Sequence, residues 1–220
     1  NALAFIPGQF LQVHFEYDDG KPTKRSYSVA TVANDPYNQE AHIEIAVSYV
    51  DGGAATKLLS ALAPGETVQA SGPYGRFVLF DTDRNARYLL VATGTGVTPY
   101  RAMLPELLRH HRERGIEVVL LQGARSAVDL LYANEFDAFA DAQPWFRYVP
   151  CLSREARATA RGDDRSGYVQ QAFPEFTPDA ARDIAYLCGN PNMVDASFEA
   201  LKAFGLPVPA IRREKYVSSR

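Results

Sequence analysis

The chain has 220 residues with 46% hydrophobic and 22% charged content, which suits one large or two small globular domains with an apolar core. Its net charge of −3 gives no sign of nucleic-acid binding. We also expect no signal peptide, and the sequence has no apolar run near the roughly 20 residues needed to cross a bilayer.

The first part of the chain reads as short strands punctuated by glycine and proline, the pattern of a small antiparallel barrel. Alternation predicts strands over residues 9–15, 25–31, 42–50 and 67–70. Because side chains alternate along a strand, Arg25 and Tyr27 share one face, and Ser26 and Ser28 share the other. A cation beside a ring, with hydroxyls next to it, could hold a flat, aromatic and phosphorylated ligand.

A glycine-rich loop precedes a short predicted helix over residues 57–62. Free N–H groups and the positive end of the helix dipole make such a loop a candidate anion site. The candidate residues are Gly53, Ala54, Ala55 and Thr56. Thr56 is either the helix N-cap or a phosphate ligand, and an ordinary turn with a capping threonine explains the same residues.

The pattern changes near residue 84, where we place a domain boundary. Near-continuous apolar strands are predicted over residues 87–93 and 117–122. A helix is predicted between them that ends near Arg114, and Pro105 should either kink this helix or move its start to a later residue. Further strands are predicted near 146–152, 185–188 and 210–217, and further helices near 134–141, 168–173 and 192–204. Strands alternating with helices predict an open parallel α/β sheet.

The loop after the first apolar strand has the glycines of a dinucleotide-binding turn. Glycines let a backbone approach a pyrophosphate, and the following helix N-terminus favours its charge. The candidate residues are Gly94, Thr95, Gly96, Thr98 and Pro99, with Pro99 where the usual fingerprint has its third glycine. A structural turn is the alternative explanation for this loop.

A second departure from the fingerprint concerns the ribose. After the strand 117–122, Arg125 stands near the place of the acid that usually binds a ribose 2′-hydroxyl. An arginine there favours a 2′-phosphate, and therefore NADP over NAD, whereas a solvated loop arginine is the alternative.

Cys188 and Gly189 lie at the carboxyl end of a predicted strand, the edge at which open α/β sheets bind ligands. The alternative is a buried structural cysteine. Together with Cys151, the chain has two cysteines, which favours a reducing, cytoplasmic setting over a disulfide framework. The four histidines show no metal-binding spacing, so we predict no metal site.

The motifs RSYS, GGAAT, GPYG, GTGVTP and CGNPNM, in this order, resemble the ferredoxin–NADP reductase superfamily over almost the whole chain. CGNPNMV and DLLY are most similar to the bacterial ferredoxin (flavodoxin)–NADP reductases. The resemblance implies an FAD-binding antiparallel β-barrel over residues 1–83 and an NADP-binding α/β domain over residues 84–220. Because the chain starts at Asn1 rather than methionine, we expect the first barrel strand to lie upstream of it.

The resemblance also implies roles for particular residues. Arg25 and the residues Gly53 to Thr56 would bind the FAD pyrophosphate, with Ser26 beside them, Tyr27 would pack on the flavin, and Ser28 would approach its N5 atom. Gly94 to Pro99 and Gly189 would contact the nicotinamide nucleotide, with Cys188 beside its C4 atom. Ser153 and Arg154, in the motif SRE, would hold the 2′-phosphate. Glu214 and Tyr216 would complete the catalytic group with Ser28 and Cys188, and Tyr216 would stack on the flavin ring.

The implied activity is hydride exchange with NADP(H) and single-electron exchange with ferredoxin or flavodoxin. Residues 165–169 look more like NAD-using oxygenase reductases, although Arg165 could supply a second contact to the phosphate. The alternatives are an NADH-dependent oxygenase reductase, an NAD(P)H:flavin reductase and a non-catalytic FAD-binding subunit. A basic rim could steer an acidic partner, or could be an ordinary solvated surface; its residues are Lys21, Lys24, Arg212, Arg213, Lys215 and Arg220.

Overall fold

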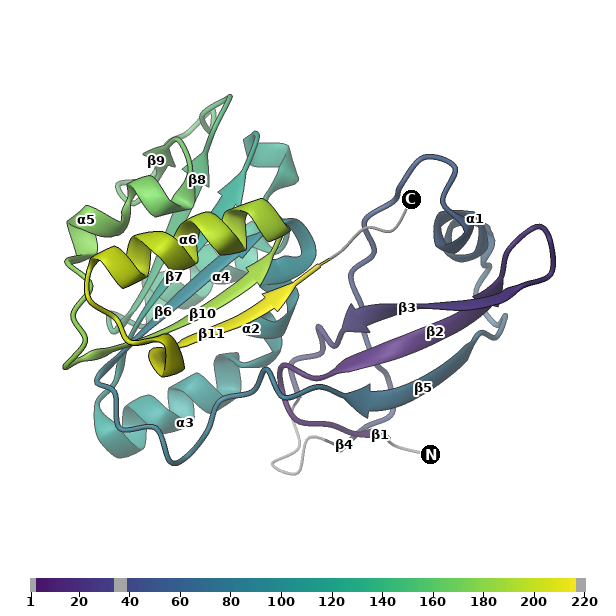
Figure 1. The fold of residues 1–220 in the computed structure, drawn as a ribbon, viewed down its shortest axis with the longest axis horizontal. Coiled ribbons are helices and arrows are strands. Elements are labelled where there is room, and N and C mark those ends of the chain that lie inside the picture. The colour runs from purple at the N-terminus through teal and green to yellow at the C-terminus, as the bar shows by residue number, and fades with distance from the viewer. Residues whose placement is uncertain (1–2, 34–38, 217–220) are drawn as a thin grey trace.

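The computed structural model describes residues 3–33 and 39–216, whose two larger sheets lie side by side (Figure 1). The N-terminal sheet is antiparallel, with the strand order β3-β2-β5. Its strands are β2 (Phe10–Glu16), β3 (Pro22–Ser28) and β5 (Gln69–Tyr74). A separate antiparallel pair joins β1 (Leu3–Ala4) to β4 (Gln39–Glu40), and helix α1 (Ala54–Ala61) lies between β4 and β5 in the chain.

The predicted strand over residues 42–50 is not a regular strand. It pairs at one bridge, between Val29 and Ile45, and Ala30 N–H donates to the Glu44 carbonyl oxygen at 2.8 Å. Beyond this bridge, Ala46, Ser48 and Val50 line a cavity, so this part of the backbone faces a binding space instead of a neighbouring strand.

The C-terminal sheet is parallel and has six strands in the order β11-β10-β6-β7-β8-β9. The strands are β6 (Arg87–Thr93), β7 (Glu117–Ala124), β8 (Phe146–Leu152), β9 (Arg165–Ser166), β10 (Asp183–Gly189) and β11 (Ile211–Lys215). The helices are α2 (Thr98–Ala102), α3 (Leu104–Arg114), α4 (Ala133–Ala142), α5 (Phe173–Phe176) and α6 (Pro191–Ala203). The fold class expected from the sequence, an antiparallel domain followed by a parallel α/β domain, is confirmed.

Apolar side chains fill both faces of the parallel sheet, which explains the near-continuous apolar strands of the sequence. Tyr88 and Leu90 pack in the core on one face, and Leu89 and Val91 pack in the core on the other. The chain order reverses at β6, because β7 and β8 follow on one side and β10 and β11 lie on the other. The carboxyl ends of β6 and β10 therefore form a switch point, where open α/β sheets place their ligands.

Prolines set two helix boundaries. The helix after β6 is divided at Met103 into α2 and α3, and Pro105 stands in the first turn of α3, where its missing N–H costs nothing. The predicted helix over 168–173 is instead a 3₁₀ turn, Val169–Gln171, followed by α5, in which Pro174 occupies the first turn. Among the residues described, no helix is both long and apolar enough to cross a membrane.

Candidate functional site

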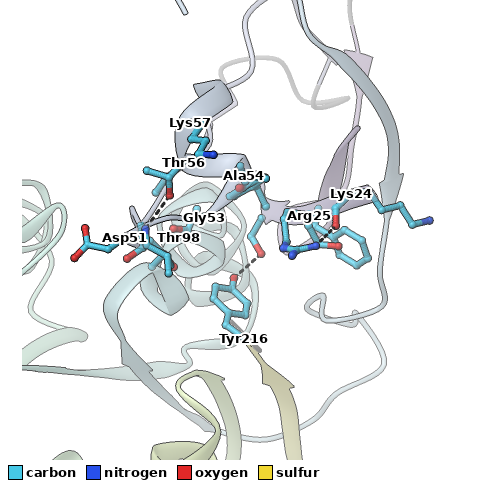
Figure 2. Close-up of a pocket in the computed structure, with 18 of the residues that line it drawn as sticks. Lys24, Arg25, Asp51, Gly53, Ala54, Thr56, Lys57, Thr98 and Tyr216 are labelled. Carbon is cyan, nitrogen blue, oxygen red and sulfur yellow. Dashed lines mark hydrogen bonds between the residues drawn. The ribbon is translucent and has the colours of Figure 1, made fainter. Parts of the chain in front are cut away.

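A cavity of about 880 Å³ lies between the antiparallel sheet, helix α1 and the carboxyl edge of the parallel sheet (Figure 2). Its size lies in the range of small-molecule and cofactor sites, about 300–1,000 Å³. The lining includes many residues singled out from the sequence: Arg25, Ser26, Tyr27, Ser28, Gly53, Ala54, Ala55, Thr56, Thr95, Thr98, Glu214 and Tyr216. Segments distant in sequence thus meet around one space.

The N-terminus of α1 presents free backbone N–H groups to this cavity. The helix begins at Ala54 with Gly53 as its N-cap, and no side chain caps it. Lys57 N–H donates to the Gly53 carbonyl oxygen at 3.0 Å, whereas no backbone acceptor takes the N–H groups of Ala54, Ala55 or Thr56 within the described chain. Three unpaired donors at the positive end of a helix dipole suit an anion.

Thr56 is not the N-cap, contrary to one of the two readings of the sequence. It is the third residue of α1, and its Oγ1 accepts a hydrogen bond from Val50 N–H at 2.8 Å. The helix therefore starts three residues before the predicted boundary, and the Thr56 hydroxyl closes the loop that precedes it (Figure 2).

Arg25 supplies a cation to the same cavity. Its guanidinium donates to Thr23 Oγ1 and to Tyr17 Oη, both at 3.2 Å, and lies 5.7 Å from the centre of the Phe15 ring. Over residues 3–33 and 39–216 it forms no ion pair, whereas the neighbouring Lys57 is paired with Asp18 at 2.7 Å. The charge of Arg25 thus remains available to an anion held by the amides of α1.

Ser28, Glu214 and Tyr216 form a hydrogen-bonded group that joins the two domains. Ser28 Oγ lies 2.5 Å from Tyr216 Oη and 3.5 Å from Glu214 Oε1. Burial raises the pKa of Glu214 to about 7, and the Ser28 hydrogen bond opposes this rise. Burial, together with neighbouring acidic groups, also holds the pKa of Tyr216 well above its usual value. The structure therefore brings together three of the four predicted catalytic residues.

The fourth, Cys188, lies behind this group and does not line the cavity. It is completely buried at the end of β10, and its thiol contacts Tyr216. Burial and then the Glu214 charge raise the pKa of the thiol well above its usual value. Tyr216 lines the cavity and thus stands where a ligand would have to enter to reach Cys188.

The loop after β6 and the loop after β10 pack backbone against backbone. A Cβ atom on Gly96 would lie 2.2 Å from the Cys188 carbonyl oxygen, and one on Gly189 would lie 2.6 Å from the Thr93 carbonyl oxygen. Gly94 and Gly189 also have positive φ angles, of 54° and 129°. Close backbone packing and positive φ angles therefore explain the glycines at these positions without any ligand.

Two threonines of the same loop do reach the cavity. Thr95 and Thr98 line it, whereas Gly94, Gly96, Pro99 and Gly189 do not. Thr98 is 1% exposed, and its Oγ1 has no hydrogen-bond partner in the described structure. A buried, unpaired hydroxyl in a cavity wall suits a polar group of a bound ligand.

Arg125, Ser153 and Arg154 lie together at the ends of β7 and β8, outside this cavity. Arg154 N–H donates to the Arg125 carbonyl oxygen at 2.9 Å, and Ser153 Oγ donates to the Ala124 carbonyl oxygen at 3.3 Å. Both arginine side chains are exposed, and neither forms an ion pair with a described residue. Two exposed arginines in backbone contact, neither with a carboxylate partner among the described residues, suit a phosphate.

Arg165 does not fit the role of a second phosphate ligand suggested by the sequence. Its Nε donates to both carboxylate oxygens of Glu175, at 2.9 and 2.8 Å, and its Nη1 donates to the carbonyl oxygens of Gly162 and Asp164. These contacts neutralise its charge and occupy its Nε and Nη1 donors.

The sequence did not identify one wall of the cavity, formed by Ala46, Ser48 and Val50. Alternation places these three residues on one face of an extended segment, but it does not show whether that face meets a strand or a cavity. The same alternation predicts a strand of the barrel.

Three of the six residues of the basic rim expected from the sequence are neutralised by ion pairs. Lys21 pairs with Asp19, Arg212 with Asp83 and Lys215 with Asp195. Arg213 lies over the Phe198 ring, 3.8 Å from its centre, and Lys24 has no ion pair in the described structure, while Arg220 lies outside the described residues. These pairs weaken the case for electrostatic steering of an acidic partner.

A cluster away from the cavity has the geometry of a cation site. Ligand atoms of Asp81, Glu106 and His110 all lie within 4.8 Å of one another. Arg109 Nη2 donates to Asp81 Oδ1 at 2.7 Å and lies 3.0 Å from His110 Nε2, so a guanidinium already supplies the positive charge there.

The raised pKa of Glu214 predicts a pH-dependent stability. Glu214 has its ordinary pKa of 4.5 in the unfolded chain and a pKa of about 7 in the folded protein. Between these values the folded protein binds more protons than the unfolded chain, so the free energy of unfolding should fall as pH rises through this window. We expect the unfolding free energy of the protein relative to its Glu214→Gln variant to fall by on the order of 1 kcal/mol from pH 5 to pH 8, after allowance for partial exposure. Urea unfolding at both pH values measures it, and a constant difference would contradict the burial of this carboxyl.

Comparison with protein-family models gives two matches. Residues 1–79 match the oxidoreductase FAD-binding domain, and residues 90–198 match the oxidoreductase NAD-binding domain. The cavity lies where segments of these two regions meet, since Arg25 belongs to the first and Thr98 to the second.

Curated relatives are of two kinds. The chain is 35% identical to an aromatic O-demethylase reductase subunit from Amycolatopsis sp., covering 97% of this chain and 61% of that protein. It is 34% identical to ferredoxin–NADP reductase B from Sorangium cellulosum, covering 98% of this chain and 86% of that protein. The chain thus spans less than two thirds of the first relative and most of the second.

Solved structures agree with these relatives. An Amycolatopsis cytochrome P450 reductase has a TM-score of 0.81 at 35% identity, over 98% of this chain and 62% of that one. A ferredoxin NADP⁺ reductase from Neisseria gonorrhoeae, with bound FAD and NADP, has a TM-score of 0.77 over 96% of this chain and 87% of that one. At 21% identity, the second likeness concerns the fold alone.

Proposed function

The chain belongs to the ferredoxin–NADP reductase superfamily of FAD- and NAD(P)-binding oxidoreductases, and from this membership we propose that it exchanges electrons between NADP(H) and a one-electron carrier, ferredoxin or flavodoxin. The observation that carries the proposal is the single cavity in which the anion-binding features, Arg25 and the α1 amides, meet the Ser28–Glu214–Tyr216 group. A site of this kind can hold the phosphates of a cofactor at one end and its reacting ring at the other.

FAD fits this cavity by the chemistry of its walls. Arg25 and the N–H groups of residues 54–56 would bind the pyrophosphate, and Tyr27 and Tyr216 would pack against opposite faces of the flavin ring. When bound, FAD supplies the hydride and single-electron chemistry, and the protein orients it. Ser28 would position the reacting edge of the ring through its hydroxyl.

The nicotinamide would be received at the junction of the two loops that pack together after β6 and β10. Gly94, Gly96, Pro99 and Gly189 would shape this junction through their backbone, while the unpaired Thr98 hydroxyl would contact the ligand. Since Cys188 is buried behind Tyr216, the Tyr216 ring would have to move aside before a nicotinamide could reach the thiol.

Arg125, Ser153 and Arg154 would hold the 2′-phosphate of NADP. We therefore expect Arg154→Ala to raise the KM for NADPH by about tenfold, since it removes one charge-assisted contact to a phosphate. The KM for NADH should change less than twofold, because NADH carries no 2′-phosphate. Steady-state reduction of ferricyanide with each nucleotide measures both constants, and an equal rise in the two would show that Arg154 does not discriminate between them.

A second candidate is the reductase component of an oxygenase that uses NADH. The Arg165–Glu175 ion pair favours it, because it removes a cation expected near a 2′-phosphate. The reductase subunit from Amycolatopsis, which is longer than this chain, is consistent with it. A higher kcat/KM for NADH than for NADPH would favour this candidate over the first.

An acceptor panel tests the proposed partner. NADPH-dependent turnover should be supported by a ferredoxin or a flavodoxin at micromolar concentration, and by ferricyanide as a general acceptor. Turnover with free flavin but with neither protein would instead identify an NAD(P)H:flavin reductase. Binding of FAD without turnover of any acceptor would identify a non-catalytic subunit.

A further inference from the structure

Arg101 on helix α2 connects the two domains beside the cavity. We propose that Arg101, Glu44 and Tyr132 form an interdomain clasp, which positions the nicotinamide site against the flavin site and so sets the rate of hydride transfer. This inference rests on the proposed function, and it assigns to these three residues a positioning role rather than contact with the reacting atoms.

The Arg101 guanidinium binds both domains at once. Toward the FAD-binding domain, Nη1 donates to the Ala30 carbonyl oxygen and to Glu44 Oε2, each at 2.8 Å. Toward the NAD-binding domain, Nε and Nη2 donate to the two carboxylate oxygens of Glu135, at 2.7 and 3.2 Å. The side chain is 14% exposed, which limits the screening of these charges by solvent.

Tyr132 closes the clasp from the NAD-binding domain. Its hydroxyl donates to Glu44 Oε1 at 2.8 Å, so the Glu44 carboxylate receives one hydrogen bond from Tyr132 and one from Arg101. The Arg101 guanidinium lies 4.4 Å from the centre of the Tyr132 ring. Tyr132 has a φ of 60°, a conformation unfavourable for an aromatic residue, so its surroundings hold it there.

The contacts of the clasp lie close to the proposed reaction site in both domains. In the FAD-binding domain, Ala30 follows Ser28 by two residues. Its N–H donates to the Glu44 carbonyl oxygen at 2.8 Å, so the two partners of Arg101 in this domain are bonded to each other. In the NAD-binding domain, Thr98 stands one helical turn before Arg101 on α2 and lines the cavity.

Helix α2 is also fixed to the parallel sheet, which makes it a rigid connection. The Tyr100 hydroxyl donates to the carbonyl oxygens of Val91 on β6 and Tyr186 on β10, at 3.1 and 2.7 Å. Consecutive residues of one short helix thus bind the sheet and the other domain. A displacement of about 1 Å between reacting groups can slow a reaction by about a hundredfold, so loosening this connection should affect the hydride step.

Arg101→Lys tests the clasp, because it keeps the charge but removes the planar fork that reaches four acceptors. In rapid-mixing experiments we expect flavin reduction at saturating NADPH to slow by about tenfold, with the NADPH concentration at half-saturation changed less than twofold. Reoxidation of the reduced flavin by ferricyanide should keep its rate, since it needs no alignment of nicotinamide. Tyr132→Phe, which removes one hydrogen bond, should slow reduction about threefold.

Arg109→Lys is the matched control, because Arg109 also contacts three carboxylates, those of Asp81, Glu106 and Glu113, but outside the cavity. It should leave both half-reactions unchanged. If the reduction rates of Arg101→Lys and Tyr132→Phe stayed within twofold of the parent, or if reduction and reoxidation fell together with the FAD content, the clasp would have no positioning role. A parent protein that binds no FAD would refute the proposed function instead, before any variant is compared.

Discussion

The Gly96→Ala variant is expected to lose about 3 kcal/mol of folding stability, roughly a hundredfold in the folding equilibrium. The new Cβ would lie 2.2 Å from the Cys188 carbonyl oxygen, 2.6 Å from its carbonyl carbon and 2.7 Å from the Gly189 Cα. All three are backbone atoms, so no side chain can swing aside to make room. To accept the methyl group, the loops after β6 and β10 would have to separate, and the nicotinamide site proposed between them would be lost.

Gly162→Ala is the control for this substitution. A Cβ at Gly162 would meet no heavy atom within 4 Å, and neither glycine has a φ in the left-handed region. Its stability should stay within about 0.5 kcal/mol of the parent protein. Urea unfolding of the three proteins measures the effect, and equal stability of the two variants would contradict the close packing of the two loops.

The Arg25→Ala variant is expected to bind FAD about tenfold to a hundredfold more weakly, because a charge-assisted hydrogen bond to a phosphate contributes about 1.5–3 kcal/mol. Arg25 forms no ion pair with a described residue, so its removal leaves no unpaired carboxylate in the protein. The loss should fall at high ionic strength, where the parent protein also binds the pyrophosphate less tightly. Titration of the apoprotein with FAD, followed by quenching of flavin fluorescence, gives the dissociation constants.

Arg112→Ala makes the same change in net charge at an exposed position of α3, away from the cavity. Its FAD affinity should equal that of the parent protein. An Arg25→Ala affinity within twofold of the Arg112→Ala value would remove Arg25 from the pyrophosphate site, even if the protein is a flavoenzyme.

Much of the fold follows from local patterns in the sequence. The apolar runs at 87–93 and 117–122 predicted buried parallel strands because helices cover both faces of the sheet, and these strands are β6 and β7. Motif order likewise indicated that Arg25 and the loop before α1 serve one site, and the structure places both in the wall of one cavity.

What could not be predicted depends on contacts between distant segments. Alternation in residues 42–50 could not show that Ala46, Ser48 and Val50 face a cavity instead of a paired strand. Arg165 looked available for a phosphate because its partner Glu175 lies ten residues away in another element. The Arg212–Asp83 ion pair of the basic rim is of the same kind, since these residues are 129 residues apart. Composition gives the number of charges but not their partners.

Anaerobic titration of the purified protein with NADPH tests the central proposal most directly. The protein should be yellow as isolated or after addition of FAD, and its flavin absorbance should bleach on addition of one equivalent of NADPH. Admission of ferricyanide should then restore the absorbance. A protein that stays colourless in the presence of FAD, or a bound flavin that neither NADPH nor NADH reduces, would contradict the assignment of this cavity as the site of hydride exchange.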